Sequence, residues 1–168
     1  MSTRQHKADA PARVRVGILT VSTTRTPASD RSGQWIRTRA EKEGHRVVCH
    51  RLVTDEAEII RQAVREIVQT LRPHLLILTG GTGIGRHDVS IETVRPMMRK
   101  ELTAFSSVFS QLSFEQIDSA AIMSRATAGV VEETAVFCLP GSLNACKLAC
   151  NELIFPEAGH LARHLNEN

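Results

Sequence analysis

The sequence predicts a three-layer α/β/α domain with a mostly parallel central sheet. Three short apolar runs have the length of buried strands, over residues 13–21, 75–79 and 135–139. Segments with helical spacing separate them, and loops rich in glycine, serine and threonine follow their ends. Strands that alternate with helices favour a parallel sheet covered on both faces. We expect a disordered tail over residues 1–13 and one domain over residues 14–168.

In the first half of the chain, periodicity and helix breakers define the expected elements. The first apolar run begins with alternating valines, as a strand entering a buried sheet does, and a loop rich in Ser and Thr follows it. Gly44 closes one helix, and Pro73 ends a longer one with a continuous apolar face. The expected elements are a strand over 13–21, a loop over 22–32, a helix over 33–42, a strand over 46–53 and a helix over 59–71.

The second half repeats this alternation of strands and helices. The run over 75–79 is typical of a central parallel strand, and it continues directly into a segment with four glycines. Pro140 turns the chain after another apolar run, and Pro156 opens the last helix. The expected elements are strands over 75–79 and 135–139 and helices over 90–99, 105–122, 143–154 and 156–165.

Composition and charge exclude several classes of protein. The net charge of +3 resides in residues 1–15, because residues 16–168 carry 17 basic and 17 acidic side chains. A neutral domain with one Trp and no Tyr is not expected to bind nucleic acid. No apolar run approaches the roughly 18 residues of a membrane span. The four cysteines form no C-x-x-C pair and no secretory signal is present, so we expect a cytoplasmic protein with reduced thiols.

Three loops follow the ends of expected parallel strands, over residues 22–32, 79–88 and 140–142. Ligands of open α/β sheets bind beyond the carboxyl ends of the strands, so these loops should converge on one binding site. Asp30 and Ser142 each precede an expected helix, where they can cap it or help its amides to hold an anion.

The glycine loop, residues 79–85, has the sequence TGGTGIG. Its glycines can expose backbone amides to an anion. A tight strand–helix turn would need only one or two glycines, so four glycines in six residues favour a ligand-binding role. The common phosphate motifs do not fit. Arg86 and His87 stand where a P-loop has Lys and Ser or Thr, and Arg86 replaces the third glycine of the dinucleotide motif.

Two acidic residues, Asp55 and Asp88, lie just after expected strands. Asp88 follows the glycine loop, where a carboxylate makes sense if it holds a divalent cation that bridges phosphates. Each residue can equally be a helix N-cap. Arg125 can supply a cation to an anionic ligand, but a surface pair with Glu132 or Glu133 is the simpler interpretation.

The histidines form no evident metal set. His160 and His164 are four residues apart near the C-terminus, a spacing that can bind zinc, but no H-E-x-x-H pattern accompanies them. We interpret this pair as part of a solvated helix face. Cys146 and Cys150 have the same spacing and are interpreted as small buried residues.

The ordered set of motifs resembles the MoaB/Mog family of molybdenum cofactor biosynthesis proteins, which is similar to the gephyrin G domain. The resemblance extends over residues 15–165 and is closest to MoaB in length. It depends on six segments: DRSG at 30–33, TGGTG at 79–83, RHDV at 86–89, LSFE at 112–115, SRA at 124–126 and LPGS at 139–142.

This resemblance implies a fold, a reaction and a site. Molybdopterin would be adenylylated with Mg-ATP and pyrophosphate released; the alternative is a non-catalytic molybdopterin-binding or scaffolding protein. Asp88 would hold Mg²⁺, and Asp55 would be a second catalytic acid. The remaining binding residues would be Ser22, Asp30, Ser32, Gly33, Thr79, Gly80, Gly81, Thr82, Gly83, Ser113, Pro140, Gly141 and Ser142. A homotrimer or homohexamer is implied, and a molybdenum-insertion protein is a possible partner.

Overall fold

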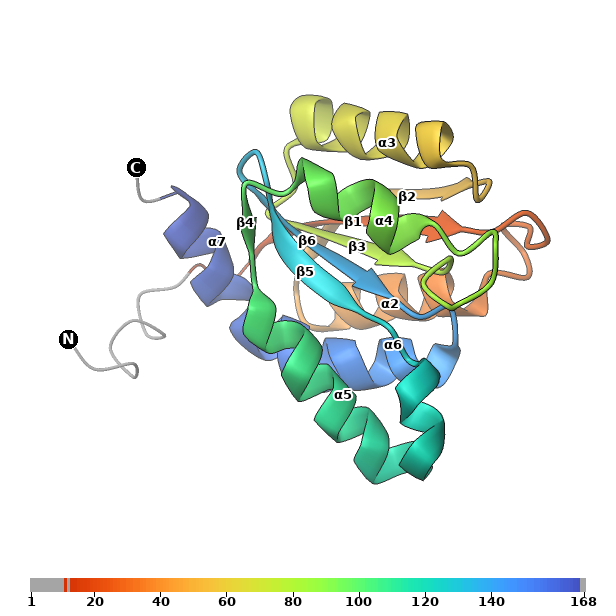
Figure 1. The fold of residues 1–168 in the computed structure, drawn as a ribbon. Coiled ribbons are helices and arrows are strands. Elements are labelled where there is room, and N and C mark those ends of the chain that lie inside the picture. Colours follow the sequence, from red (N-terminus) through yellow and green to blue (C-terminus); the bar gives the residue numbers. More distant parts are fainter. Residues whose placement is uncertain (1–10, 12, 167–168) are drawn as a thin grey trace.

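The computed structural model describes residue 11 and residues 13–166, so most of the expected N-terminal tail lies outside the described residues. The strands are β1 (Arg15–Val21), β2 (Arg46–Val53), β3 (Leu75–Thr79), β4 (Lys100–Glu101), β5 (Thr127–Val131) and β6 (Thr134–Leu139). The α-helices are α2 (Arg31–Lys42), α3 (Ala57–Glu66), α4 (Ser90–Val94), α5 (Thr103–Ile117), α6 (Leu143–Ala149) and α7 (Ala158–Asn166). Figure 1 shows helices above and below one central sheet.

The strands form a six-stranded sheet in the order β2-β1-β3-β6-β5-β4. The first four strands run parallel to one another, whereas β5 is antiparallel to β6 and β4 is antiparallel to β5. The register pairs Thr20 with Thr79 and Thr79 with Leu139, so β1, β3 and β6 end at one edge. This arrangement confirms the predicted α/β class with its mostly parallel sheet.

Two apolar cores cover the two faces of the sheet. The core beneath α3 and α4 contains Leu19, Leu76 and Leu78, and the opposite core contains Ile18, Leu75 and Ile77. Helices α2, α5, α6 and α7 pack on that second face (Figure 1). Because β1 and β3 are buried on both faces, they appear in the sequence as continuous apolar runs rather than as alternating patterns.

Two strands and several helix ends differ from the sequence prediction. Strands β4 and β5 were not expected, and β5 joins β6 through a short turn in which Glu132 has a φ of 50°. That turn contains no glycine or asparagine, so it carries none of the usual hairpin signals. The expected helices over 59–71 and 143–154 each end in a π-helical segment, Ile67–Leu71 and Cys150–Ile154.

The four cysteines are free, and three of them are buried. Burial raises the pKa of the Cys138 thiol to about 12 and also raises the pKa of Cys146 and Cys150. Cys49 is half-buried, and burial raises its pKa as well. No helix among the described residues is long and apolar enough to cross a bilayer.

Burial of the cysteines predicts that thiol reagents modify the native chain slowly. The reactive form is the thiolate, and burial disfavours it. At most one thiol, that of Cys49, should react with iodoacetamide at pH 8 under native conditions, and all four should react in denaturant. Mass spectrometry of the labelled chain measures this. Rapid native labelling of Cys138, Cys146 or Cys150 would contradict the packing.

Candidate functional site

The three predicted loops meet at the carboxyl ends of β1, β3 and β6 around a cavity of about 590 Å³. Helix α2 follows β1 on one face of the sheet, and α4 follows β3 on the other (Figure 1). The cavity therefore opens at the point where the connections diverge, which is where open α/β sheets bind ligands. Its lining comprises Val21, Ser22, Thr23, Thr24, Arg25, Asp55, Gly80, Gly81, Thr82, Gly83, Asp88, Met123, Ser124, Pro140, Gly141 and Ser142.

The glycine loop begins at a very close backbone contact. A Cβ atom on Gly80 would lie 2.3 Å from the carbonyl oxygen of Val21, and Gly80 has a φ of +101°. Its amide donates to Leu139 O at 3.0 Å, and its carbonyl accepts from Ser90 Oγ at 2.8 Å. Glycine is thus required where β3 leaves the sheet between β1 and β6, whatever ligand the loop binds.

A buried carboxylate organises the first loop. Asp30 caps α2 by accepting from the Gly33 amide at 3.0 Å, and it also accepts from Thr20 Oγ1 at 2.6 Å. His50 Nε2 lies 2.8 Å from Asp30 Oδ2. A Cβ on Gly33 would come within 2.7 Å of all three of these side chains, so the glycine leaves room for the network.

The network also fixes the charge of Asp30. Burial alone would raise the pKa of its carboxyl group, but hydrogen bonds from Thr20, the Gly33 amide and His50 outweigh burial and lower the pKa below its ordinary value. The carboxylate therefore stays ionised although its side chain is only 1% exposed. A buried charge with several donors is stable only in this geometry, which makes it a rigid anchor for the loop.

Arg25 connects the first loop to the third. Its Nη2 donates to Gly141 O at 2.8 Å, and its Nη1 lies 3.9 Å from Asp30 Oδ1. Ser32 Oγ donates to the same Gly141 carbonyl at 2.9 Å. The Pro140–Ser142 turn is thus held from two positions of the first loop, and Ser142 caps α6 through the Ala145 amide.

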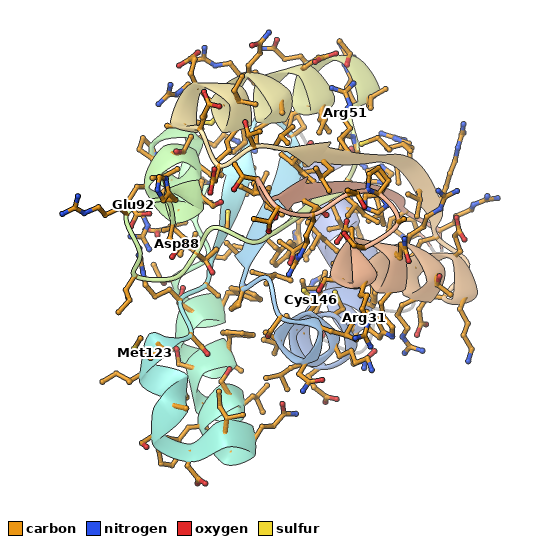
Figure 2. The ribbon with its side chains drawn as sticks, turned by 90° about the vertical axis from the view of Figure 1, so that its right-hand side faces the viewer. Arg31, Arg51, Asp88, Glu92, Met123 and Cys146 are labelled. Atoms are coloured by element: carbon orange, nitrogen blue, oxygen red, sulfur yellow. The ribbon has the colours of Figure 1, made fainter. Side chains whose placement is uncertain are left out.

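Neither Asp55 nor Asp88 caps a helix, since the N-cap positions of α3 and α4 are Glu56 and Val89, without side-chain cap bonds. Asp88 Oδ2 instead accepts from the Gly85 amide at 2.8 Å, within the glycine loop. Asp55 Oδ2 is 3.4 Å from Thr23 Oγ1. Both carboxylates line the cavity, and Figure 2 looks onto this edge with Asp88 labelled.

The fixed charges of the cavity are unbalanced. Among the described residues, Arg25 is the only basic residue that lines it, and Asp55 and Asp88 carry the opposite charge. An anion entering such a cavity meets amide donors and one guanidinium but also two carboxylates. Oxygen ligands of this type suit Mg²⁺, which would offset the repulsion. Among the described residues, no group of three or more His, Cys, Asp or Glu side chains is arranged to hold a metal by itself.

The other predicted residues fall into two groups. Asp30, Ser32, Gly33 and Thr79 lie behind the lining; Thr79 Oγ1 donates to Pro140 O at 3.1 Å and so supports the turn. Ser113 is buried in α5 and does not line the cavity.

The expected surface pair of Arg125 with Glu132 or Glu133 is wrong. Arg125 pairs with Glu92 and donates to Gly83 O at 2.8 Å, which ties it to the glycine loop, whereas Glu133 pairs with Arg99. The fold brings Glu92 nearer because α4 follows the glycine loop directly.

The residues of this region that the sequence analysis did not single out include Thr20, Arg25, His50 and Met123. Thr20 had a usable signal, because a polar side chain inside an otherwise apolar buried strand needs a hydrogen-bond partner. His50 lies on β2, beside β1, and pairs with Asp30 across a separation of 20 residues. Arg25 and Met123 reach the cavity only through tertiary packing.

The fold and this cavity define an open α/β protein of the kind whose small-molecule ligands bind at a topological switch point. Residues 17–160 match the family described as "Probable molybdopterin binding domain". The chain therefore belongs to this molybdenum cofactor biosynthesis family, as the motif resemblance predicted.

Individual relatives agree with this assignment. The chain is similar to molybdenum cofactor biosynthesis protein B of Bacillus subtilis (strain 168), with 44% identity covering 100% of this chain and 99% of the relative. The crystal structure of a protein with the same name superposes with a TM-score of 0.91 and 39% identity, covering 95% of this chain and 100% of that one. The tungsten cofactor synthesizing protein MoaB from Pyrococcus furiosus gives a TM-score of 0.80 at 33% identity, covering 94% and 100%.

The Asp30 network predicts a pH-dependent contribution to stability. Asp30→Asn should lower the free energy of unfolding by about 1–3 kcal/mol at pH 7, because a charged, multiply bonded acceptor is lost. The pKa of Asp30 is lower in the folded state than in the unfolded state. Its contribution to stability is therefore fully present above the unfolded-state pKa of about 3.9, and it is lost as the pH falls through the folded-state pKa. Urea unfolding of both chains at pH 7 and at pH 3 or below measures it. If the difference in the free energy of unfolding between the two chains is as large in acid as at pH 7, the stabilising role of ionised Asp30 is wrong.

Proposed function

We propose that this protein binds molybdopterin and adenylylates it with Mg-ATP, releasing pyrophosphate. The observation that carries the proposal is the cavity at the carboxyl edge, where glycine-loop amides face two carboxylates that cap no helix. Family membership supports molybdopterin as the substrate. A site that only held an anionic ligand would gain nothing from two carboxylates, whereas a site that loads magnesium needs them.

The reaction is a nucleotidyl transfer with balanced bonds. A terminal phosphate oxygen of molybdopterin attacks the α-phosphorus of ATP and forms a new P–O bond, while the bond to the β-phosphate breaks and pyrophosphate leaves. Such transfers need positioning and charge neutralisation more than covalent help from the protein. Gly81, Thr82 and Gly83 line the cavity, where their amides would orient a phosphate, and Arg25 would neutralise one of its charges.

Asp88 and Asp55 are the residues that would hold magnesium. Asp88 uses Oδ2 to accept from Gly85, and among the described residues no hydrogen bond engages its Oδ1. Asp55 has only the long contact from Thr23. Both carboxylates thus keep oxygen lone pairs for a hard cation. When bound, Mg²⁺ supplies positive charge to the phosphate oxygens.

Asp88→Asn should lower pyrophosphate release by at least about 100-fold, because the neutral amide cannot offset the charge of a divalent ion. Asp55→Asn should act in the same direction. The measurement is pyrophosphate formation from Mg-ATP by purified protein with molybdopterin. Glu152→Gln, at an exposed position of the π-helical segment Cys150–Ile154, is the matched control and should leave the rate unchanged.

Molybdopterin binding without any pyrophosphate from the unaltered protein would overturn the enzyme proposal. The chain would then be a molybdopterin-binding or scaffolding protein of the same pathway. Unaltered turnover in Asp88→Asn would instead show that the acid serves the glycine loop structurally.

We further propose that the chain assembles as a homotrimer or homohexamer. The helix α5 and the turn after it, Asp118–Met123, expose a surface of large apolar side chains. Ile122 is 86% exposed, Phe114 57% and Met123 52%. A second cavity of about 720 Å³ lies in this surface, and Ser124 lines both cavities. An apolar patch this dense over α5 and the segment after it is typical of an interface.

Ile122→Glu should shift the assembly towards monomer, because a charge would have to be desolvated at the centre of the patch. Light scattering after size exclusion measures the mass. Ile59→Glu on α3, at 39% exposure and on the other side of the sheet, is the control and should leave the mass unchanged. A monomeric unaltered chain at micromolar concentration would contradict the proposed assembly.

A further inference from the structure

The amino ends of the parallel strands carry a cluster of basic side chains. Arg15 begins β1, Arg46 begins β2, and the register places these two residues side by side. Together with Arg13, Val14 and His74 they line a cavity of about 370 Å³, which we call the amino-edge cavity. This edge of the sheet is opposite to the one at which β1, β3 and β6 end (Figure 1). The cluster is therefore separate from the candidate site.

His74 is a fixed hydrogen-bond donor in this cavity. Its ring Nδ1 accepts from the Arg15 amide at 2.9 Å, and its own amide donates to the Arg15 carbonyl at 2.9 Å. A backbone amide can only donate, so Nδ1 carries no proton and neutral His74 has its ring hydrogen on Nε2. Burial and the positive charge of Arg15 lower the pKa of His74, which keeps the ring neutral. Within the described part of the chain, no hydrogen bond engages Nε2.

Arg15 presents a guanidinium whose position is also set. Its Nε and Nη2 donate to the Arg72 carbonyl at 3.1 Å and 2.7 Å. Arg72 ends the π-helical segment Ile67–Leu71, so these bonds close the helix and give Arg15 a structural role. The other N–H groups of the guanidinium remain for a ligand. Two donor groups of the cavity are thus ordered in advance, which lowers the entropy cost of binding.

The amino-edge cavity concentrates positive charge without a carboxylate to offset it. None of its described lining residues is acidic. The arginine ion pairs within the described ranges involve neither Arg13, Arg15 nor Arg46. Like charges on neighbouring strands repel each other, so this arrangement costs stability in the unliganded fold. A bound anion would remove that repulsion.

We propose that the amino-edge cavity binds a small anion of the phosphate class. Arg13, Arg15 and Arg46 supply the positive charge, and the Nε2 hydrogen of His74 supplies a directed donor. The planar fork of a guanidinium matches two oxygens of one phosphate group. The five residues of β3 separate this cavity from the candidate site by roughly 17 Å. Binding here therefore requires neither magnesium nor the proposed reaction.

The lining recognises charge rather than a base or a sugar. Among the described lining residues Val14 is the single apolar one, and no Phe or Trp is present to stack on a base. Pyrophosphate should bind more tightly than inorganic phosphate, because it carries more negative charge. Inorganic triphosphate and ATP distinguish a free oligophosphate from a nucleotide. We expect the two to bind with equal affinity, since the cavity offers adenosine nothing.

Titration of the full-length protein with pyrophosphate, in buffer containing EDTA, tests the proposal. The readout is the nuclear magnetic resonance signal of the His74 ring, which His74→Gln identifies by its loss. This signal should shift to saturation, and added NaCl should weaken the affinity because salt screens exposed charges. Arg13→Gln and Arg46→Gln should each weaken the affinity by about three- to tenfold, because each removes a charged donor at the surface.

Controls separate loss of the ligand contact from loss of structure. Arg37→Gln removes an exposed arginine of α2, which pairs with Glu41 away from the cavity, and should leave the affinity unchanged. Arg13 and Arg46 are exposed, so their variants should keep the circular dichroism spectrum of the unaltered protein. The proposal is wrong if millimolar pyrophosphate does not move the His74 signal, or if both arginine variants bind as tightly as the unaltered protein. Because no turnover is measured, either result leaves the proposed reaction untouched.

Discussion

Parallel pairing of β1 with β3 and of β3 with β6 is the constraint on which the rest of the molecule depends. The register ends all three strands at one edge, and this brings together loops that start 60 residues apart, after Thr79 and Leu139. Strands this close leave no room for a side chain directly after β3, and Gly80 occupies this position against the Val21 carbonyl. The cavity is thus a consequence of sheet geometry before any ligand is considered.

The loops around the cavity are held by buried polar contacts rather than by apolar packing. Asp30 forms hydrogen bonds with Thr20, with His50 and with the first turn of α2. Arg25 and Ser32 donate hydrogen bonds to the Gly141 carbonyl and so connect the first loop to the third. A network of this kind is stable only when all its members are satisfied. It therefore fixes the first and third loops relative to each other.

Much of the fold could be predicted from the sequence. Strands β2 and β3 have the predicted bounds. For β3 the reason is burial on both faces of the sheet, which leaves a continuous apolar run in the sequence. The hairpin partner β5 was missed, since Glu132 makes its turn with a positive φ that this residue type does not announce. The sequence pattern thus predicted most helices and strands, whereas the strands at the β5–β4 edge of the sheet depend on tertiary pairing.

The candidate site was predictable in outline and not in its contacts. Loop positions after parallel strands indicated a common cavity, and ten of its lining residues were named in advance: Ser22, Asp55, Gly80, Gly81, Thr82, Gly83, Asp88, Pro140, Gly141 and Ser142. Spacing could not decide whether Asp55 and Asp88 cap helices, because capping depends on the backbone at the N-cap position. The hydrogen bond of Arg25 to the Gly141 carbonyl likewise has no local signature, because it spans 116 residues.

The charge of the cavity gives the strongest argument about its chemistry. One guanidinium faces two carboxylates in a space lined by backbone amides. For an anionic ligand alone, each carboxylate would oppose binding, and neither is needed to start a helix. A divalent cation reverses the sign of both contributions, because the same oxygens become its ligands and the phosphate its counter-charge. The carboxylates therefore suit a phosphorylated ligand that is accompanied by a divalent cation better than an anionic ligand alone.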